Sequence, residues 1–176
     1  MTTIVAVEND KGVLFASDSR ITTGWQVNDG WVDKIVRNGE ITFAAAGFLR
    51  TIQILAYAKL VVPPVTDDPK AIDRYVALEL IPAITSAFKD SAAETALQYS
   101  VLLVSVRGRV YCVNGDGSYA RNKNGFYAVG SGSEYALGAL EAGATAKQAV
   151  KIASKYDTFT NKDVRQMKTE SIPSTT

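Results

Sequence analysis

A threonine directly follows the first methionine, and a hydroxyl at the start of a chain can act as a nucleophile. The sequence contains no histidine and a single cysteine, which excludes a Ser-His-Asp triad and a Cys-His pair. A threonine hydroxyl needs neither partner, because the α-amine of the same residue can accept its proton. That amine has an unperturbed pKa of about 7.7–8.0, in the range where general bases are most effective. We therefore expect Thr2 to be the nucleophile after removal of Met1, which the small size of Thr2 favours.

The amine of Thr2 would need a neighbouring charge to adjust its basicity. A nearby cation disfavours the protonated amine and lowers its pKa. Lys34, in "WVDKIV", is a candidate cation, and Asp18, in "FASDSR", is a candidate carboxylate to hold it. Both residues lie in segments that can pair in the same sheet as the N-terminal strand. Taken alone, the two charges have an ordinary alternative, because Asp18 would also suit a turn and Lys34 a solvated strand.

Composition limits the class of protein and its partners. The chain has 176 residues and 47% hydrophobic residues, which fits one domain over 1–176, with 171–176 as a loose tail. A net charge of +1 argues against nucleic acid or a membrane surface as the main partner. We find neither a membrane-spanning apolar run nor a signal peptide, so we expect a cytoplasmic protein. The lone Cys112 allows no internal disulfide.

The predicted elements alternate between blocks of strands and pairs of helices. The first block holds strands with turns at Asn9–Gly12, at "NDG" and at Asn38-Gly39. Its predicted strands are 2–8, 12–19, 25–27, 31–36, 34–38 and 41–46. A helix over 48–62 should stop at Pro63-Pro64. A second helix over 66–90 begins with Pro69 in its first turn, and Pro82 should kink or split it.

A second round of strands and helices follows. The predicted strands are 98–106, 109–115 and 125–132, and the predicted helices are 133–142 and 145–155. Thr145 and Gln148 form a capping-box pattern at the start of the second helix. The stretch 163–170 could be a last short strand. Two helical pairs separated by β blocks favour an α+β domain in which helices cover the outer faces of two stacked sheets.

Several motifs, taken together, resemble one known family. "MTTIVAV", "GVLFASDSRITTG", the Lys34 segment and "FAAAG" occur in the order and spacing of proteasome β-subunits and of the similar bacterial HslV protease. "GSGSEYA" resembles the family's Gly-Ser-Gly motif, with Ser131 on its serine. "YDTFTN" offers Asp157 and Thr160, which resemble the proteasome's Asp-x-x-Ser pair. The resemblance implies a four-layer αββα sandwich, the N-terminal nucleophile (Ntn) hydrolase fold.

The resemblance also implies roles for individual residues. Thr2 would attack the peptide bond, Lys34 would supply positive charge, and Asp18 would hold Lys34. Ser131 and Asp157 would orient the amine and a water. The backbone N–H that binds the oxyanion falls at Ala46, with Gly47 next, where the family has a glycine following an alanine.

Further implied sites concern the substrate and a metal. Residues of the first specificity pocket would be Ser19, Arg20, Ile21, Val32, Val36 and Ala44, which suggests apolar side chains before the cut. No cofactor is required, although HslV relatives can hold Na⁺ on backbone carbonyls near the positions of Ser154, Asp157 and Thr160.

The function that follows is a threonine-type endopeptidase that encloses its active sites in stacked rings. The resemblance implies rings of identical subunits, hexamers or heptamers, and an ATPase unfoldase that feeds in unfolded proteins. Two alternatives stay open. One is a non-catalytic ring or scaffold subunit, since Met1 would block the amine and Ala46 departs from the family pattern. The other is a small-molecule amidase of the same nucleophile class.

Overall fold

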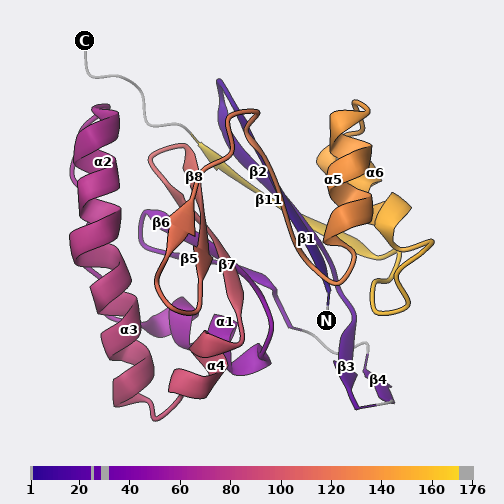
Figure 1. The fold of residues 1–176 in the computed structure, drawn as a ribbon, viewed down its shortest axis with the longest axis horizontal. Helices are drawn as coiled ribbons and strands as arrows, with labels where there is room; N and C mark the ends of the chain where they lie inside the picture. Colours follow the sequence, from indigo (N-terminus) through magenta and orange to yellow (C-terminus); the bar gives the residue numbers. More distant parts are fainter. Residues whose placement is uncertain (1, 25, 29–31, 171–176) are drawn as a thin grey trace.

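The computed structural model describes residues 2–24, 26–28 and 32–170, which form two stacked sheets between two groups of helices (Figure 1). This is the α+β, four-layer αββα sandwich that the sequence predicts. Met1 and the predicted tail at 171–176 lie outside the described residues. No helix in the described part of the chain is long and apolar enough to cross a membrane.

The first sheet carries the N-terminal strand at its centre. Its four antiparallel strands lie in the order β10-β1-β2-β11. The strands are β1 (Thr3–Asn9), β2 (Gly12–Asp18), β10 (Phe126–Gly130) and β11 (Val164–Glu170). β1 and β2 form the predicted hairpin, in which Ile4 pairs with Ser17 and Asn9 with Gly12. The hairpin therefore brings the start of β1 beside the end of β2.

The second sheet is an antiparallel meander, with its strands in chain order. The strands are β5 (Ile35–Asn38), β6 (Ile41–Ala46), β7 (Val101–Val106), β8 (Arg109–Asn114) and β9 (Tyr119–Ala120). A small separate ribbon pairs β3 (Ile21–Thr23) with β4 (Gln26–Asn28).

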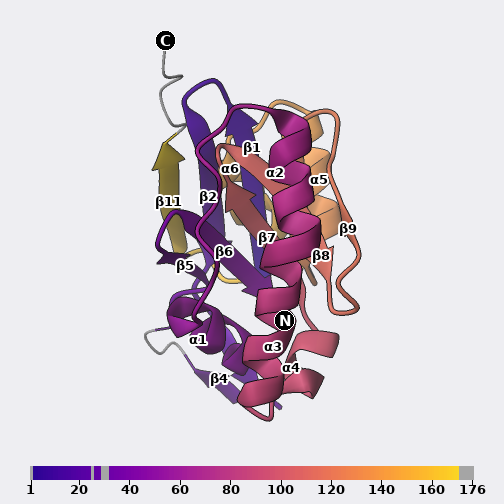
Figure 2. The same cartoon turned by 90° about the vertical axis from the view of Figure 1, so that its left-hand side faces the viewer.

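Helices cover the two outer faces, as Figures 1 and 2 show. The five-stranded sheet is covered by α1 (Leu49–Tyr57), α2 (Pro69–Tyr75), the π-helical segment η1 (Val76–Leu80), α3 (Ile81–Asp90) and α4 (Glu94–Gln98). The four-stranded sheet is covered by α5 (Ser133–Glu141) and α6 (Ala146–Ala153). The predicted capping box of Thr145 and Gln148 begins α6.

Strand alternation divides the interior into three apolar layers. On β6, Phe43 and Ala45 face the helices α1–α4, whereas Ala44 and Ala46 face the other sheet. On β1, Ile4 packs between the sheets, whereas Val5 packs against α5 and α6. The near-continuous apolar runs of these strands follow from being covered on both faces.

The first predicted helix is shorter than expected. Apolar periodicity continues to residue 62, but α1 ends at Tyr57. The Asn38 side-chain amide donates to the carbonyls of Leu55 (2.9 Å) and Ala58 (2.8 Å). These bonds satisfy backbone acceptors that a longer helix would use internally. The predicted end at Pro63-Pro64 is therefore wrong, because a contact from a distant turn ends the helix first.

Two other local predictions need correction or refinement. The predicted "NDG" hairpin of 25–27 with 31–36 is wrong for its described residues, because 26–28 pair with 21–23 instead. Gly24, with φ +59°, allows that earlier reversal. Trp25 and residues 29–31 lie outside the described residues. Pro82 was expected to kink or split its helix, and the structure has a π-helical segment directly before it, where the Ile81 N–H donates to the Val76 carbonyl. Helix α4 was not predicted.

Candidate active site

Thr2 lies directly before β1, next to the end of β2. The pairing of Ile4 with Ser17 places Thr3 opposite Asp18, the last residue of β2. Thr2 is buried, as are Thr3 and Asp18. The Thr3 N–H donates to Asp18 Oδ1 over 3.0 Å. A hairpin of ordinary geometry therefore brings Thr2 to a carboxylate sixteen positions away.

Lys34 completes a three-residue contact with Thr2 and Asp18. Lys34 precedes β5, which lies in the other sheet, so the prediction that its segment pairs in the sheet of the N-terminal strand is wrong. The contact instead joins the two sheets. Its Nζ donates to Asp18 Oδ1 over 2.8 Å and also to the Thr2 hydroxyl oxygen. The Thr2 hydroxyl in turn donates to Asp18 Oδ1. Asp18 Oδ2 accepts from the Arg20 N–H at 3.0 Å, so both carboxylate oxygens are held.

Burial sets the electrostatics of this cluster. Only 8% of Lys34 is exposed and Asp18 is fully covered. Loss of solvation lowers the pKa of the Lys34 ammonium, and the Asp18 carboxylate opposes that shift. A buried ion pair with additional backbone hydrogen bonds is thereby positioned against the hydroxyl of Thr2.

Ser131 and Asp157 meet on the other side of Thr2. Ser131 Oγ donates to Asp157 Oδ2 over 2.8 Å and to the Thr2 carbonyl over 3.4 Å. The Thr160 hydroxyl donates to Asp157 Oδ2 over 2.5 Å and lies 2.6 Å from the Thr3 hydroxyl. This network links the turn after α6 and the turn before α5 to the first two described residues. The structure therefore brings together all five residues to which the sequence assigned catalytic roles.

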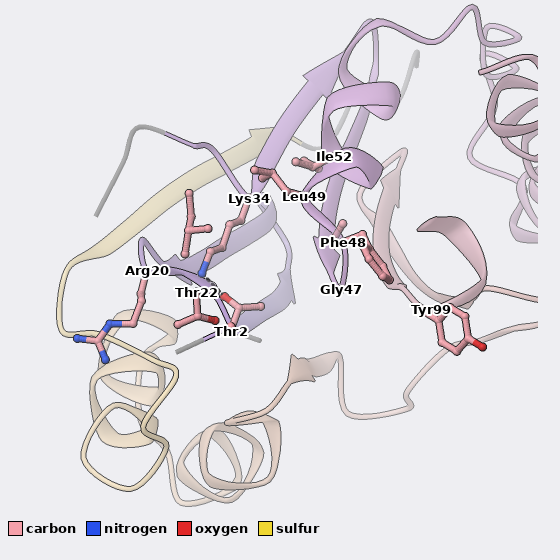
Figure 3. A pocket seen from close by; sticks show the side chains of 12 residues that line it. Thr2, Arg20, Thr22, Lys34, Gly47, Phe48, Leu49, Ile52 and Tyr99 are labelled. Carbon is pink, nitrogen blue, oxygen red and sulfur yellow. Dashed lines mark hydrogen bonds between the residues drawn. The ribbon is translucent and has the colours of Figure 1, made fainter. Parts of the chain in front are cut away.

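A cavity of about 530 Å³ opens beside the Thr2 hydroxyl (Figure 3). The figure shows Thr2 and Lys34 on one side of it, with Gly47, Phe48 and Tyr99 opposite. The lining residues are Thr2, Arg20, Ile21, Thr22, Gly24, Lys34, Ala45, Gly47, Phe48, Leu49, Ile52 and Tyr99. Most of these side chains are apolar, the charged ones are cations, and no carboxylate is among them.

Gly47 is required by the shape of the chain after β6. Its φ of +140° is disfavoured for residues with a side chain. A Cβ there would lie 2.3 Å from Ser100 Oγ and 2.7 Å from the Tyr99 carbonyl. Ala46, by contrast, continues β6 and packs between the sheets. Of the two predicted oxyanion positions, the structure places Gly47 on the Thr2 cavity and Ala46 away from it.

The predicted specificity pocket is partly misplaced. Arg20 and Ile21 line the cavity, as expected. Ala44 instead faces the other sheet, because side chains alternate along β6 and its neighbour Ala45 takes the cavity side. Ser19 is buried against Asn161. The Asn161 side-chain oxygen accepts hydrogen bonds from the Ser19 N–H (3.2 Å) and from the Ser19 hydroxyl (3.3 Å).

Val32 and Val36 also do not line the cavity. Both pack against the core beneath α1–α4, which also contains the lining residue Ile52. They lie behind the cavity wall rather than on it.

Sequence reasoning missed the residues that support the site from outside the motifs. Asn161 holds Ser19, and its N–H lies 3.5 Å from Asp18 Oδ2. Ser100 Oγ accepts from the Phe48 N–H (3.3 Å) and lies 2.9 Å from the Thr51 hydroxyl, which fixes the chain beyond Gly47. Only the "FTN" letters around Asn161 carried a signal for either residue.

The proposed sodium residues lie on one short segment after α6. The Asp157 carbonyl accepts from the Thr160 N–H over 3.2 Å, and Arg20 Nη1 donates to the Thr158 carbonyl over 2.8 Å. The guanidinium thus already places positive charge at this turn. Na⁺ at Ser154, Asp157 and Thr160 stays a prediction. Among residues 2–24, 26–28 and 32–170, no three His, Cys, Asp or Glu side chains gather as a metal site.

Comparison with known proteins finds similarity to proteins named HslV. No protein-family model matches the chain. It is 27% identical over 177 residues to the ATP-dependent protease subunit HslV of Thermosipho africanus, covering 91% of this chain and 93% of that protein. The HslV of Thermosipho melanesiensis is 25% identical with the same coverage.

Solved structures show the same fold. Thiobacillus denitrificans BPH in complex with epoxomicin superposes with a TM-score of 0.77 and 25% identity, over 97% of this chain and all of that one. HslV from Trypanosoma brucei superposes with a TM-score of 0.70 and 21% identity, over 94% of this chain and 97% of that one. The chain therefore has the N-terminal nucleophile hydrolase fold. Over most of its length, the chain is similar in sequence to proteins named HslV.

Proposed function

We propose that this chain is a threonine-type endopeptidase whose nucleophile is the Thr2 hydroxyl. The observation that supports this most strongly is the contact of the hydroxyl with a buried Lys34–Asp18 pair at the edge of an open cavity. An enzyme without histidine needs another base, and removal of Met1 would free the Thr2 amine for that role. The cytoplasmic location predicted from the sequence suits such removal.

The chemistry proceeds in two steps. Thr2 Oγ attacks the carbonyl carbon of the substrate, and the hydroxyl proton passes to the Thr2 amine. The C–N bond then breaks, the amine returns the proton to the leaving nitrogen, and an ester remains on Thr2. A water, deprotonated by the same amine, hydrolyses the ester and restores the hydroxyl. Lys34 stabilises negative charge on Oγ during attack, and Asp18 fixes the direction of Lys34.

The remaining site residues have positioning roles in this proposal. Ser131 and Asp157 orient the amine and the water, since their hydrogen bonds end at the Thr2 carbonyl. The backbone N–H of Gly47 is our candidate oxyanion donor, because Gly47 lines the Thr2 cavity and Ala46 does not. The apolar wall of Phe48, Leu49 and Ile52 favours large apolar side chains before the cut.

We further propose that the chain works as stacked rings of identical subunits with an ATPase partner that delivers unfolded proteins. The names of the Thermosipho relatives, which describe an ATP-dependent protease subunit, support this part. Six or seven subunits per ring both fit the resemblance. Analytical ultracentrifugation of the purified chain would measure the number of subunits.

Covalent labelling by epoxomicin, a peptide epoxyketone, tests the catalytic proposal. The epoxyketone reacts with both the hydroxyl and the free amine of one threonine, so an adduct on Thr2 requires the processed N-terminus. We expect intact-mass spectra to show loss of Met1 and one adduct per chain. Thr2→Ala should give no adduct and no cleavage of fluorogenic peptides.

Other outcomes would support the two alternatives. Retention of Met1 on every chain, with no adduct, would favour a non-catalytic ring subunit. Turnover of acyl-homoserine lactones or penicillins without turnover of peptides would favour a small-molecule amidase.

A further inference from the structure

Gly47 lines a second cavity in addition to the one that contains the Thr2 hydroxyl. This second cavity has a volume of about 570 Å³ and opens at the end of the layer between the two sheets. Its walls come from β6, β7, β8 and β10 and from the turn into α5. The lining includes Ala46, Val101, Cys112, Val129, Gly130 and Ser131.

The second cavity reaches Thr2 through its backbone. Gly130 packs so closely that a Cβ there would lie 2.1 Å from the Thr2 carbonyl oxygen. Ser131 Oγ donates to the same oxygen. The Thr2 hydroxyl faces the first cavity, whereas the Thr2 carbonyl contacts two residues that line the second. Thr2 and Gly47 therefore lie at the boundary between the two spaces.

The second cavity is uncharged and mostly apolar. None of the residues that line it carries a charged side chain. Cys112 is partly buried, and burial raises the pKa of its thiol, so it presents a neutral surface at pH 7. Val101 and Cys112 also pack against the core between the sheets. Entry of an apolar side chain would extend that core, whereas a carboxylate or ammonium would lose solvation without finding a partner.

We propose that this second cavity binds the residue that follows the cut bond and selects apolar side chains there. The inference rests on the proposed function. Attack by Thr2 at a carbonyl beside Gly47 divides the substrate at the boundary between the cavities. With the acyl part in the Thr2 cavity, the leaving part crosses Gly47 and Gly130 into the second.

Matched peptides test the selection. Internally quenched peptides would share the sequence before the cut and carry Gly, Leu or Asp directly after it, with the cut position verified by mass spectrometry. We expect kcat/KM to be about tenfold higher for Leu than for Asp, the scale of discrimination in an apolar pocket. Val101→Phe, which fills the cavity, should lower the Leu value about tenfold and leave the Gly value within twofold. Val62→Phe is the matched control, because Val62 is exposed and lies outside both cavities.

Epoxomicin separates the two proposals, because it reacts without a leaving group. Its rate of adduct formation should be the same in wild type and Val101→Phe. Equal cleavage of the Leu and Asp peptides, with normal adduct formation, would overturn the second-cavity proposal alone. Absence of the wild-type adduct would instead remove the proposed function, and this inference with it.

A chemical modification covers the case in which Val101→Phe misfolds. Cys112 is the only cysteine, so methyl methanethiosulfonate adds one small group at that site and a reductant removes it. We expect modification to lower cleavage of the Leu peptide more than that of the Gly peptide, and reduction to restore it. An equal loss on both peptides would contradict the proposal.

Discussion

The Lys34–Asp18 pair makes a quantitative prediction about stability, because both charges are buried against Thr2. Lys34→Met leaves Asp18 without its cation. Removing one partner of a buried pair costs about 3–5 kcal/mol. We expect about 3 kcal/mol in the free energy of unfolding, near the lower end of that range. The reason is that the Asp18 carboxylate still accepts hydrogen bonds from the Thr3 and Arg20 N–H groups, each over 3.0 Å, and these bonds stabilise its charge.

The reverse substitution should cost less. Asp18→Asn leaves a buried ammonium whose pKa is already lowered by burial. Loss of Asp18 lowers that pKa further, so Lys34 can release its proton and become neutral. We therefore expect about 1–2 kcal/mol, within the ordinary range for a single substitution. The double variant carries neither charge of the pair, and its cost should fall short of the sum of the two single costs by about 2 kcal/mol.

Urea unfolding of the four proteins measures these values. The protein concentration must be the same throughout, because assembly into rings would make stability depend on it. The midpoint and slope of each curve give the free energy of unfolding. A double variant whose cost equals the sum of the two single costs would refute the argument, since it would mean that the charges do not interact. Equal slopes are the control for comparable unfolding transitions.

Three other features give measurable outcomes. Gly47→Ala should abolish epoxomicin adduct formation, whereas Gly138→Ala, with open space around it in α5, should leave it intact and stabilise the helix by about 0.5–1 kcal/mol. Burial raises the pKa of Tyr75 to about 12, so its contribution is complete below pH 10 and is lost as pH rises towards 12. The free energy of unfolding of Tyr75→Phe should therefore fall less between pH 10 and pH 12 than that of the wild type, by up to about 2–3 kcal/mol. An equal fall in both proteins would count against the prediction. Cys112 should react with iodoacetamide far more slowly at pH 7 than a solvent-exposed cysteine thiol does, because burial raises the pKa of Cys112. The urea-unfolded chain, in which the thiol is exposed, is the control.

The site was more predictable than its surroundings because a hairpin fixes it. Apolar runs around the turn at Asn9–Gly12 specify the β1–β2 pairing, and that register alone brings Asp18 beside Thr3. Lys34 comes from the other sheet, so periodicity could not place it. Its position was expected from the resemblance of its spacing to a known family.

The errors concern features set by contacts between distant segments. Apolar periodicity cannot show that Asn38 ends α1 by binding the Leu55 and Ala58 carbonyls. Placing Ala44 on the cavity was off by one residue, which in a strand turns the side chain to the opposite face. Ser100 gave no signal because an isolated serine has no pattern, although it holds the chain beside Gly47.

The π-helical segment before Pro82 has a consequence for how this chain tolerates deletions. A regular helix advances about 100° per residue, from 3.6 residues per turn. A π-helical turn, closed by i→i+5 hydrogen bonds, holds one residue more than an α-helical turn. Removing one residue from Val76–Leu80 would therefore let the segment close as regular α-helix, with Ile84 and Phe88 still facing the core. Removing Ala83 instead would rotate Ile84 and Phe88 by about 100°, away from the core. Val76–Leu80 is thus the part of this helical stretch that should best tolerate loss of a single residue.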